Sequence, residues 1–475
     1  MTESLTVPGI SDDETRTLNH LVKQLNEKSK RNRLRSNIYD GKRAVKQLGT
    51  VIPAQYTRLA QVLGWGAKGV DGLARRCNLD RFVWADGDID SLGIRELADS
   101  NFLFSEIGQG RTDSLLHGVS YLITTRGLEG EPKSLVHARD GLNATGDWNP
   151  RKRALDNLLS VTSRKDDTIT GFVLYLDGET ISAERNGARW AIARSTHGFG
   201  VPADPLVYRP RSSRRMGRSR ISRPVIGLQD AALRAVVRLE AHMDIYSIPK
   251  LIVLGADEGI FKNADGSPKT SWQVILGRSF GIPDDDDAAN PRADVKQFSA
   301  ESPEPHLAHL NALAKLMARE TDLPDSDFAL TDMANPTSAD AYNASRENLI
   351  AEAEGAMDDW SPSIRRTVTR ALAIQNGETS VPEAWASIDA KWRSPIYLSR
   401  AAQADAGSKQ LGAGPEWLRE TKVGLRLLGL SEQDIDEALA ERRRNAGREV
   451  VAAALAQRTQ PPAATAPEPG NAVGA

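Results

Sequence analysis

The sequence SRPVIGLQDAALRAVVRLEAHMDIYSIP, residues 222–249, carries the clearest structural signal of the chain. Its apolar residues recur every three or four positions, at Val225, Leu228, Ala232, Ala235, Leu239, Met243 and Tyr246. This spacing predicts a helix over 223–247 with one narrow apolar stripe, as in coiled-coil seams. Ser219 and Ser222 are candidate N-caps, Pro224 suits a first helical turn, and Pro249 ends the helix.

Helical patterns also dominate the part of the chain that follows. Residues 303–320 and 338–359 each place apolar side chains on one face and predict a second and a third helix. The segment between them, 321–337, is a polar loop. The region 361–457 is almost wholly helical in pattern, and the Pro/Ala-rich segment 458–475 is expected to be disordered.

The first 222 residues mix helical and strand patterns. Residues 11–35, 63–79, 92–107 and 111–117 predict helices, whereas β-branched and aromatic residues at 119–124 predict a strand. Further strand patterns are separated by Asp-Gly and Asn-Gly, which favour tight hairpin turns; they lie at 168–176, 179–183 and 189–194. Residues 250–300 again combine strands and turns. The expected fold class is therefore α+β, predominantly helical.

Composition narrows the class of protein. The 475 residues are 40% hydrophobic and 26% charged, with a net charge of −2. No apolar run approaches the roughly 20 residues that span a bilayer, so we expect no membrane segment. Basic residues outnumber acidic ones in 1–220 only modestly, which does not favour strong static DNA binding. The single cysteine, Cys77, excludes an internal disulfide and is expected to be a buried, inert thiol.

Signals of catalysis or metal binding are weak. The chain has no Gly-rich phosphate loop ending in Gly-Lys-Ser/Thr and no Gly-x-Ser-x-Gly elbow. His306 and His309 are three residues apart, but no third ligand stands at helical spacing, so surface or satisfied histidines are the better interpretation. The acidic run 284–287 is interpreted as a solvated or partner-docking loop. We therefore expect no catalytic residue, no metal and no cofactor.

A Gly/Ser-rich junction before the long helix concentrates positive charge. Its candidate contact residues are Arg211, Arg214, Arg215, Arg218 and Arg220. These arginines have two open interpretations. They contact phosphates, or they form a solvated loop that pairs with acidic groups of a neighbouring subunit.

An ordered set of short motifs resembles a known family. They are residues 39–41 (YDG), 52–53 (IP), 64–76 (GWGAKGVDGLARR), 117–121 (HGVSY), 217–221 (GRSRI) leading into the long helix and Pro249, 321–324 (TDLP) and 335–341 (NPTSADA). Together they resemble the phage portal family, in particular the SPP1-like portals of tailed phages that infect actinobacteria. The resemblance covers roughly residues 35–360.

The resemblance implies a portal fold that assembles into a dodecameric ring. The implied parts are a wing (1–222), a stem helix (223–247), a clip (248–302), a second stem helix (303–320), a tunnel loop (321–337), a wing/channel helix (338–360), a helical crown (361–457) and a disordered tail (458–475). In such a ring one heterologous interface repeats until it closes.

The same resemblance assigns roles to individual residues. The stem interface between subunits would use Val225, Leu228, Ala232, Ala235, Leu239 and Met243. Asp230, Arg234 and Arg238 would form charge pairs between subunits or line the lumen. The tunnel loop would present small polar and acidic residues to sliding DNA, namely Asp325, Asp327, Asp332, Asn335, Thr337 and Ser338.

The implied function is a conduit in the virion, with no membrane partner. Double-stranded DNA would pass through the ring during packaging and ejection, and the ring would dock the terminase large subunit, the head-tail adaptor, the major capsid protein and scaffold proteins. The subunits would reside at the capsid portal vertex, and in the host cytoplasm during assembly. The alternatives are a head-tail adaptor or scaffold-type protein of small oligomeric state and a DNA-packaging enzyme; the missing phosphate loop disfavours the enzyme.

Overall fold

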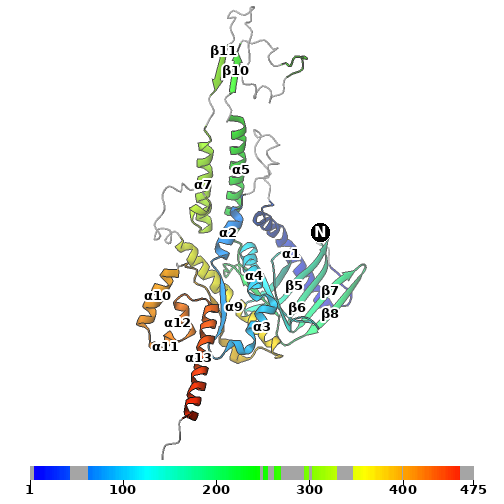
Figure 1. Cartoon of the computed structure of the whole chain (residues 1–475). Coiled ribbons are helices and arrows are strands. Elements are labelled where there is room, and N and C mark those ends of the chain that lie inside the picture. Colours follow the sequence, from blue (N-terminus) through cyan, green and yellow to red (C-terminus); the bar gives the residue numbers. More distant parts are fainter. Residues whose placement is uncertain are drawn as a thin grey trace, which may run out of the picture. The chain divides into compact units, whose positions relative to one another are not determined.

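The computed structural model describes residues 5–42, 63–246, 250–254, 262–268, 294–298, 302–328, 346–397 and 400–459 (Figure 1). It divides into two compact units, Met1–Pro395 and Ile396–Ala475. Among the described residues, no helix combines the length and apolarity that crossing a bilayer requires.

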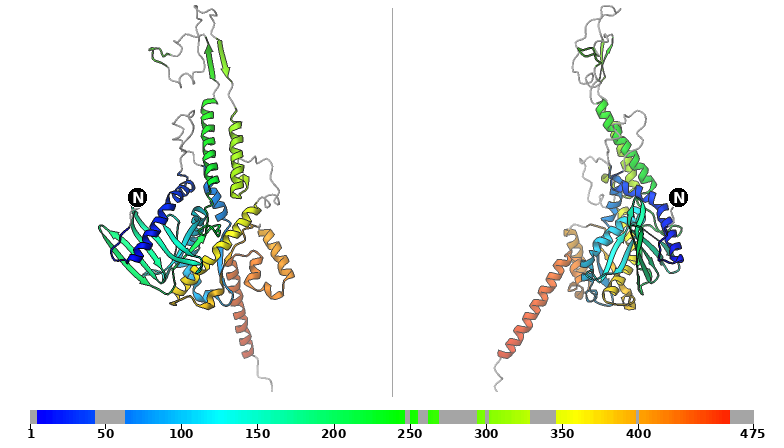
Figure 2. Two further views of the ribbon diagram at one scale, coloured as in Figure 1. Left: turned by 180° about the vertical axis from the view of Figure 1, so that it is seen from behind. Right: turned by 90° about the vertical axis from the view of Figure 1, so that its right-hand side faces the viewer.

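A five-stranded antiparallel sheet and helix α1 (Asp12–Tyr39) form one layer pair of the first unit. The strands follow chain order: β4 (Ala144–Asn149), β5 (Ala154–Lys165), β6 (Thr168–Leu176), β7 (Glu179–Asn186) and β8 (Arg189–Thr196). Ser11 and Glu14 close a capping box at the start of α1. The apolar face of α1 covers the sheet (Figure 2), burying Leu18, Leu21 and Leu25 against side chains such as Phe172.

The expected hairpin turns are confirmed. Gly178 follows β6 with φ +79°, and Gly187 follows β7 with φ +65°. Both values lie in the left-handed region, which glycine adopts without strain. The Asp-Gly and Asn-Gly pairs therefore connect β6, β7 and β8 as the sequence predicts, whereas the strand patterns of β4 and β5 were missed.

A second sheet, in the order β3-β2-β9, occupies the middle of the unit. Its strands are β3 (Ser134–Arg139), β2 (Val119–Arg126) and β9 (Ala203–Val207). The predicted strand at 119–124 is β2, the central strand, and its first six residues are buried. The helices that contact this sheet are α3 (Ile94–Asn101), α4 (Leu103–His117) and α9 (Glu347–Gln375). Helix α2 (Trp65–Ala74) packs beside α4.

Helix α9 and a strand pair correct the expected boundary at residue 360. Helix α9 runs through 360/361 with Pro362 inside it, and Trp360 is fully buried. After η5 (Glu383–Ser387), strand β12 (Ile388–Trp392) pairs antiparallel with β1 (Leu79–Trp84), which precedes η2 (Ile89–Leu92). The residues between 361 and 395 therefore belong to the first unit, and the separate helical part begins at 396 rather than 361.

The long helices of the middle of the chain are confirmed. The segment predicted at 223–247 is α5 (Arg223–Tyr246), and the segment predicted at 303–320 is α7 (Glu304–Thr321). Ser222 caps α5, since its Oγ accepts from the backbone N–H of Val225 at 3.4 Å. Strands β10 (Lys250–Leu254) and β11 (Asp294–Phe298) pair antiparallel.

Several expectations fall on residues outside the described ranges. They are parts of the strand-and-turn region 250–300, the acidic run 284–287 and most of the segment 458–475 that is expected to be disordered. The third helix, predicted at 338–359, is described from residue 347, where α9 begins.

The second unit is helical throughout its described length, as expected. It contains α10 (Arg400–Ala413), α11 (Glu416–Arg419), α12 (Lys422–Leu427) and α13 (Glu432–Thr459). Helices α10 and α12 approach so closely at Gly407 that a Cβ atom there would lie 2.0 Å from the carbonyl oxygen of Leu427. Glycine is therefore required by packing at this position.

Candidate functional site

Helices α5 and α7 lie side by side in Figures 1 and 2 and pack on each other. On α5, Val225, Ala232 and Ala235 are buried in the same apolar cluster as Ala314 and Met317 of α7. Half of the predicted α5 stripe is thus already covered within one chain.

The buried face of α5 is wider than the narrow stripe predicted for it. Leu233, Val237 and Ala241 are also buried, at 1%, 3% and 6% exposure. The physical reason is a second neighbour, because α5 contacts α2 as well as α7. Gln229 makes this contact polar: its side-chain oxygen accepts from the backbone N–H of Gly66 at 3.0 Å.

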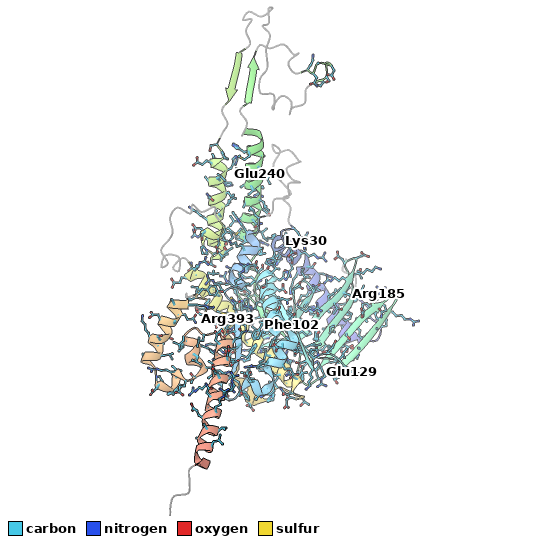
Figure 3. All side chains as sticks on the ribbon, in the orientation of Figure 1. Lys30, Phe102, Glu129, Arg185, Glu240 and Arg393 are labelled. Atoms are coloured by element: carbon cyan, nitrogen blue, oxygen red, sulfur yellow. The ribbon has the colours of Figure 1, made fainter. Side chains whose placement is uncertain are left out.

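Part of the predicted stripe stays accessible in the single chain. Leu228 and Leu239 are half-buried, and Met243 is 43% exposed. On α7, Leu316 is 50% exposed. Apolar side chains at these positions are suited to burial against another chain. Of the predicted charge-pair residues, Arg238 is exposed, whereas Asp230 and Arg234 are half-buried. Glu240, labelled in Figure 3, is also exposed on α5.

Arg220, one of the candidate phosphate contacts, is buried and therefore not available to a phosphate at the surface. It is 7% exposed, and its guanidinium donates to the carbonyl oxygens of Gly69 and Thr321 and to the hydroxyl of Tyr208. A planar guanidinium can satisfy several acceptors at once, which a lysine ammonium does less well. Arg220 therefore ties α2, the end of α7 and the segment after β9 together.

A second polar contact joins the same segment to α9. Arg209 donates to Glu352 through Nε at 2.6 Å and lies 3.5 Å from Asp322 through Nη2. Tyr208 also donates to Glu352. Burial raises the pKa of Tyr208 to about 12, so the phenol stays protonated and can donate this bond. The sequence did not indicate these residues as partners, because Glu352 stands 143 positions from Arg209.

The other arginines of the junction lie at the surface. Arg211, Arg214, Arg215 and Arg218 are exposed. Backbone hydrogen bonds in both directions between Arg211 and Arg214 close a tight turn. The guanidinium of Arg215 lies over the ring of Trp148, with 5.1 Å between the guanidinium carbon and the ring centroid. Both interpretations of this set, phosphate contacts and pairing between subunits, stay open.

The first part of the expected tunnel loop is anchored to the core. Asp325 and Asp327 belong to the short turn η4 (Asp325–Asp327), and Asp325 is exposed. Asp327 lies 3.9 Å from the guanidinium of Arg346. Phe328 is buried and packs edge-on against Trp65, at 5.8 Å between ring centroids. The remaining loop candidates, Asp332, Asn335, Thr337 and Ser338, lie outside the described residues.

The structure also describes the surroundings of His306 and Cys77, two residues considered in the sequence. His306 of α7 faces His242 of α5, with ring centroids 5.0 Å apart. Within the described ranges, no three His, Cys, Asp or Glu side chains gather as metal ligands would. Cys77 is fully buried, and burial raises the pKa of its thiol to about 12. The prediction of a buried, inert thiol is confirmed.

Helices α5 and α7 extend from the α+β body of the first unit (Figure 1) and leave Met243 and Leu316 exposed. The family model described as "Phage portal protein, SPP1 Gp6-like" matches residues 18–448. The chain therefore belongs to the phage portal protein family, and the suspected resemblance is confirmed.

Two curated relatives are portal proteins of mycobacteriophages. The chain is 25% identical over 421 residues to the portal protein of Mycobacterium phage D29, covering 87% of this chain and 84% of the relative. It is 25% identical over 427 residues to the portal protein of Mycobacterium phage L5, covering 86% and 85%. A solved structure, the neck of an empty GTA particle, matches at 15% identity with a TM-score of 0.43, over 78% of this chain and 90% of that one.

Proposed function

We propose that this portal-family chain closes into a ring of identical copies at a capsid vertex, around a channel for double-stranded DNA. The observation that carries the proposal is the apolar surface that one chain leaves uncovered on α5 and α7, at Leu239, Met243 and Leu316. A heterologous interface repeated around an axis buries such a surface in every copy and closes without leaving a free end.

In the proposed ring, the parts of the chain serve different partners. Strands β10 and β11 belong to the segment 248–302, which would dock the terminase large subunit and later the head-tail adaptor. The residues after η4 would project toward the DNA, and the α+β body would face the major capsid and scaffold proteins. The subunits would assemble in the host cytoplasm and remain in the virion.

We propose a structural role without catalysis, since the sequence holds no phosphate-binding loop of the Gly-Lys-Ser/Thr type. Measurable ATP hydrolysis or DNA cleavage by the purified protein would contradict this part of the proposal. The second candidate function is an adaptor of small oligomeric state, which would contain fewer copies and no closed ring around DNA.

Particle size separates the two candidates. Mass photometry and negative-stain microscopy of the purified chain, with and without scaffold protein, are expected to show rings of about twelve subunits with a central hole. Monomers and dimers under every assembly condition would favour the small adaptor instead.

A charged substitution on the uncovered surface tests the interface directly. Met243→Asp should reduce ring formation about tenfold or more, because each closing interface would bury an unpaired carboxylate. Met243→Leu, the matched control, should form rings normally. Thermal denaturation should show the same stability for both monomers, since Met243 is 43% exposed in the single chain. Normal ring formation by Met243→Asp would mean that these stem residues do not form the interface.

A further inference from the structure

A cavity of about 200 Å³ opens between α1, the start of β2 and the arginine turn that follows β9. Two basic runs that are distant in sequence meet there. Lys28, Arg31 and Arg35 come from the last turns of α1, and Arg214 comes from the turn. Neutral polar groups complete the wall, among them Asn32, His117 and Thr145.

Arg35 is the buried cation of the cavity lining, and its guanidinium has few hydrogen-bond acceptors. The side chain is 9% exposed. Its Nη1 donates to Oδ1 of Asn32 at 3.2 Å and to the carbonyl oxygen of His117 at 3.4 Å, whereas the buried Nε has no acceptor. A guanidinium withdrawn from water and left without a counter-charge is costly.

The four cations have no carboxylate partner among the residues that the structure describes. The charged groups nearby are engaged elsewhere. Asp147 accepts from His20 at 3.3 Å and from Gln24 at 3.1 Å. Asp140 accepts the backbone N–H of Asn143 in its own turn at 2.9 Å. Among the described residues, the lining of the cavity therefore holds four cations and no carboxylate, although Asp147 and Glu27 act on Lys28 from outside the lining.

Electrostatic effects on the lining residues agree with this geometry. Burial, and then the charges of Arg31 and Arg214, lower the pKa of Arg35 to about 10. Burial also lowers the pKa of Lys28, although Asp147 and Glu27 act in the opposite direction. An anion in the cavity would relieve both effects, because each cation would gain an opposite charge.

The cavity also offers neutral groups for hydrogen bonds to an oxyanion. His117 Nδ1 is buried without a partner, while its Nε2 lies 3.0 Å from Oγ of Ser36. Lys28 Nζ lies 3.5 Å from Oγ1 of Thr145, so its remaining protons can turn toward the cavity. Unused donors and several cations around one concave space are the features of an anion site.

We propose that this cavity binds a phosphate group. Four cations exceed what one carboxylate neutralises, whereas a phosphate with about two negative charges and several acceptor oxygens suits them better. The volume accommodates one phosphate group with a few water molecules. The two rings in the lining, Tyr121 and His117, are only 1% and 7% exposed, so the wall offers little surface for stacking a base. The phosphate itself, rather than a nucleoside, is the recognised group.

Calorimetric titration of the full chain with sodium pyrophosphate at low salt tests the proposal. We expect a Kd below about 1 mM, with inorganic phosphate binding more weakly because it carries less charge. Arg31→Ala and Arg214→Ala should each weaken pyrophosphate binding about tenfold. Both residues are exposed at the rim, so neither variant should unfold the protein.

The matched controls are neighbours of the same type outside the cavity. Lys23 and Lys30, the latter labelled in Figure 3, are exposed on α1 and lie outside the cavity lining. Lys23→Ala and Lys30→Ala should leave the Kd unchanged. Equal losses in controls and cavity variants would mean diffuse attraction to a basic surface, and would overturn the proposal.

Competition with a short DNA duplex distinguishes a small phosphate ion from the phosphate of a DNA backbone. If the phosphate is a small ion, a short DNA duplex will not displace pyrophosphate; if it belongs to a DNA backbone, the duplex will compete, and Arg214→Ala will abolish the competition. Either result supports a phosphate site. No heat of binding for the unmodified chain, or acetate binding as tightly as pyrophosphate, would overturn it, the latter by assigning the cavity to a carboxylate. The measurement does not depend on ring closure.

Discussion

Arg220 and Arg35 are both buried, yet their guanidinium groups have different surroundings. Arg220 donates to two backbone carbonyls and a hydroxyl from three parts of the fold. Arg35 contacts two acceptors and leaves its Nε without one beside a cavity. Because an unsatisfied buried group costs more free energy than a satisfied one gains, we assign Arg220 to stability and Arg35 to binding.

Removing Arg220 should destabilise the first unit. Arg220→Ala removes the buried hydrogen bonds to the carbonyl oxygens of Gly69 and Thr321 and to the hydroxyl of Tyr208, so the free energy of unfolding should fall by about 3 kcal/mol. Arg218→Ala, two residues away and exposed, should change it by less than about 0.5 kcal/mol. Urea denaturation followed by circular dichroism measures both values. Equal stability of the two variants would contradict the structural role of Arg220.

Asp113 of α4 gives the fold a pH dependence. Burial, and then Asp140 and Glu106, raise its pKa from 3.8 to about 7. The folded state therefore holds a proton that the unfolded chain releases near pH 4, and this contribution to stability is lost as the pH rises from about 4 to 7. Asp113→Asn should remove this loss and raise the free energy of unfolding at pH 8 by about 1–3 kcal/mol.

The measurement for Asp113 is thermal denaturation at pH 5 and pH 8. Asp113→Asn should narrow the difference between the two melting temperatures. The control is Asp99→Asn, at an exposed position of α3, which should keep the difference seen in the unmodified chain. A difference that Asp113→Asn leaves unchanged would mean that other groups set the pH dependence.

At the scale of elements, two glycines of α10 differ in how closely other atoms pack around them. Gly407 is buried against the carbonyl oxygen of Leu427, whereas Gly412 has no atom within 4 Å of its virtual Cβ. The same substitution at these positions thus has opposite physical consequences, since one meets backbone and the other only gains helix propensity.

Gly407→Ala should destabilise the second unit by about 1–3 kcal/mol, because α10 and α12 must separate to admit the methyl group. Gly412→Ala should stabilise it by up to about 1 kcal/mol. Limited proteolysis of the full chain, read by mass spectrometry, reports cleavage after residue 396 for each variant. Faster cleavage of Gly412→Ala than of Gly407→Ala would show that the helices are not packed in this way.

At the scale of the whole molecule, the first unit depends on residues that come late in the chain. Strand β12 pairs with β1, and the second half of α9 buries Ile364, Val368 and Leu372 in the main apolar cluster. Because these groups complete a core begun by residues 65–116, the unit cannot close before residue 395.

Two truncations test this boundary. A chain ending at residue 395 should keep a cooperative thermal transition, since it retains β12 and all of α9. A chain ending at residue 360 should lose it, because removing several fully buried side chains costs far more than the typical stability of a domain. Differential scanning calorimetry distinguishes them. A folded chain ending at 360 would restore the boundary predicted from the sequence.

Local patterns predicted the individual elements well. The spacing of apolar residues located α1, α5 and α7, and the Asp-Gly and Asn-Gly pairs located the turns between β6, β7 and β8. The strands that were missed include β1 and β12, which pair with each other at a separation of about three hundred residues. Neither has a hairpin turn beside it that would have indicated its partner.

The sequence by itself determined the long helices and the hairpins that join β6, β7 and β8, because each depends on side chains within a few positions of one another. Only the tertiary structure decided which arginine is a structural tie and which lines a cavity. Arg220 donates to an acceptor 151 positions away, and Arg35 of α1 lines the same cavity as Arg214 of the turn after β9. Contacts between residues distant in sequence set the burial and the charged neighbours of each arginine, and the local spacing of apolar residues does not predict such contacts.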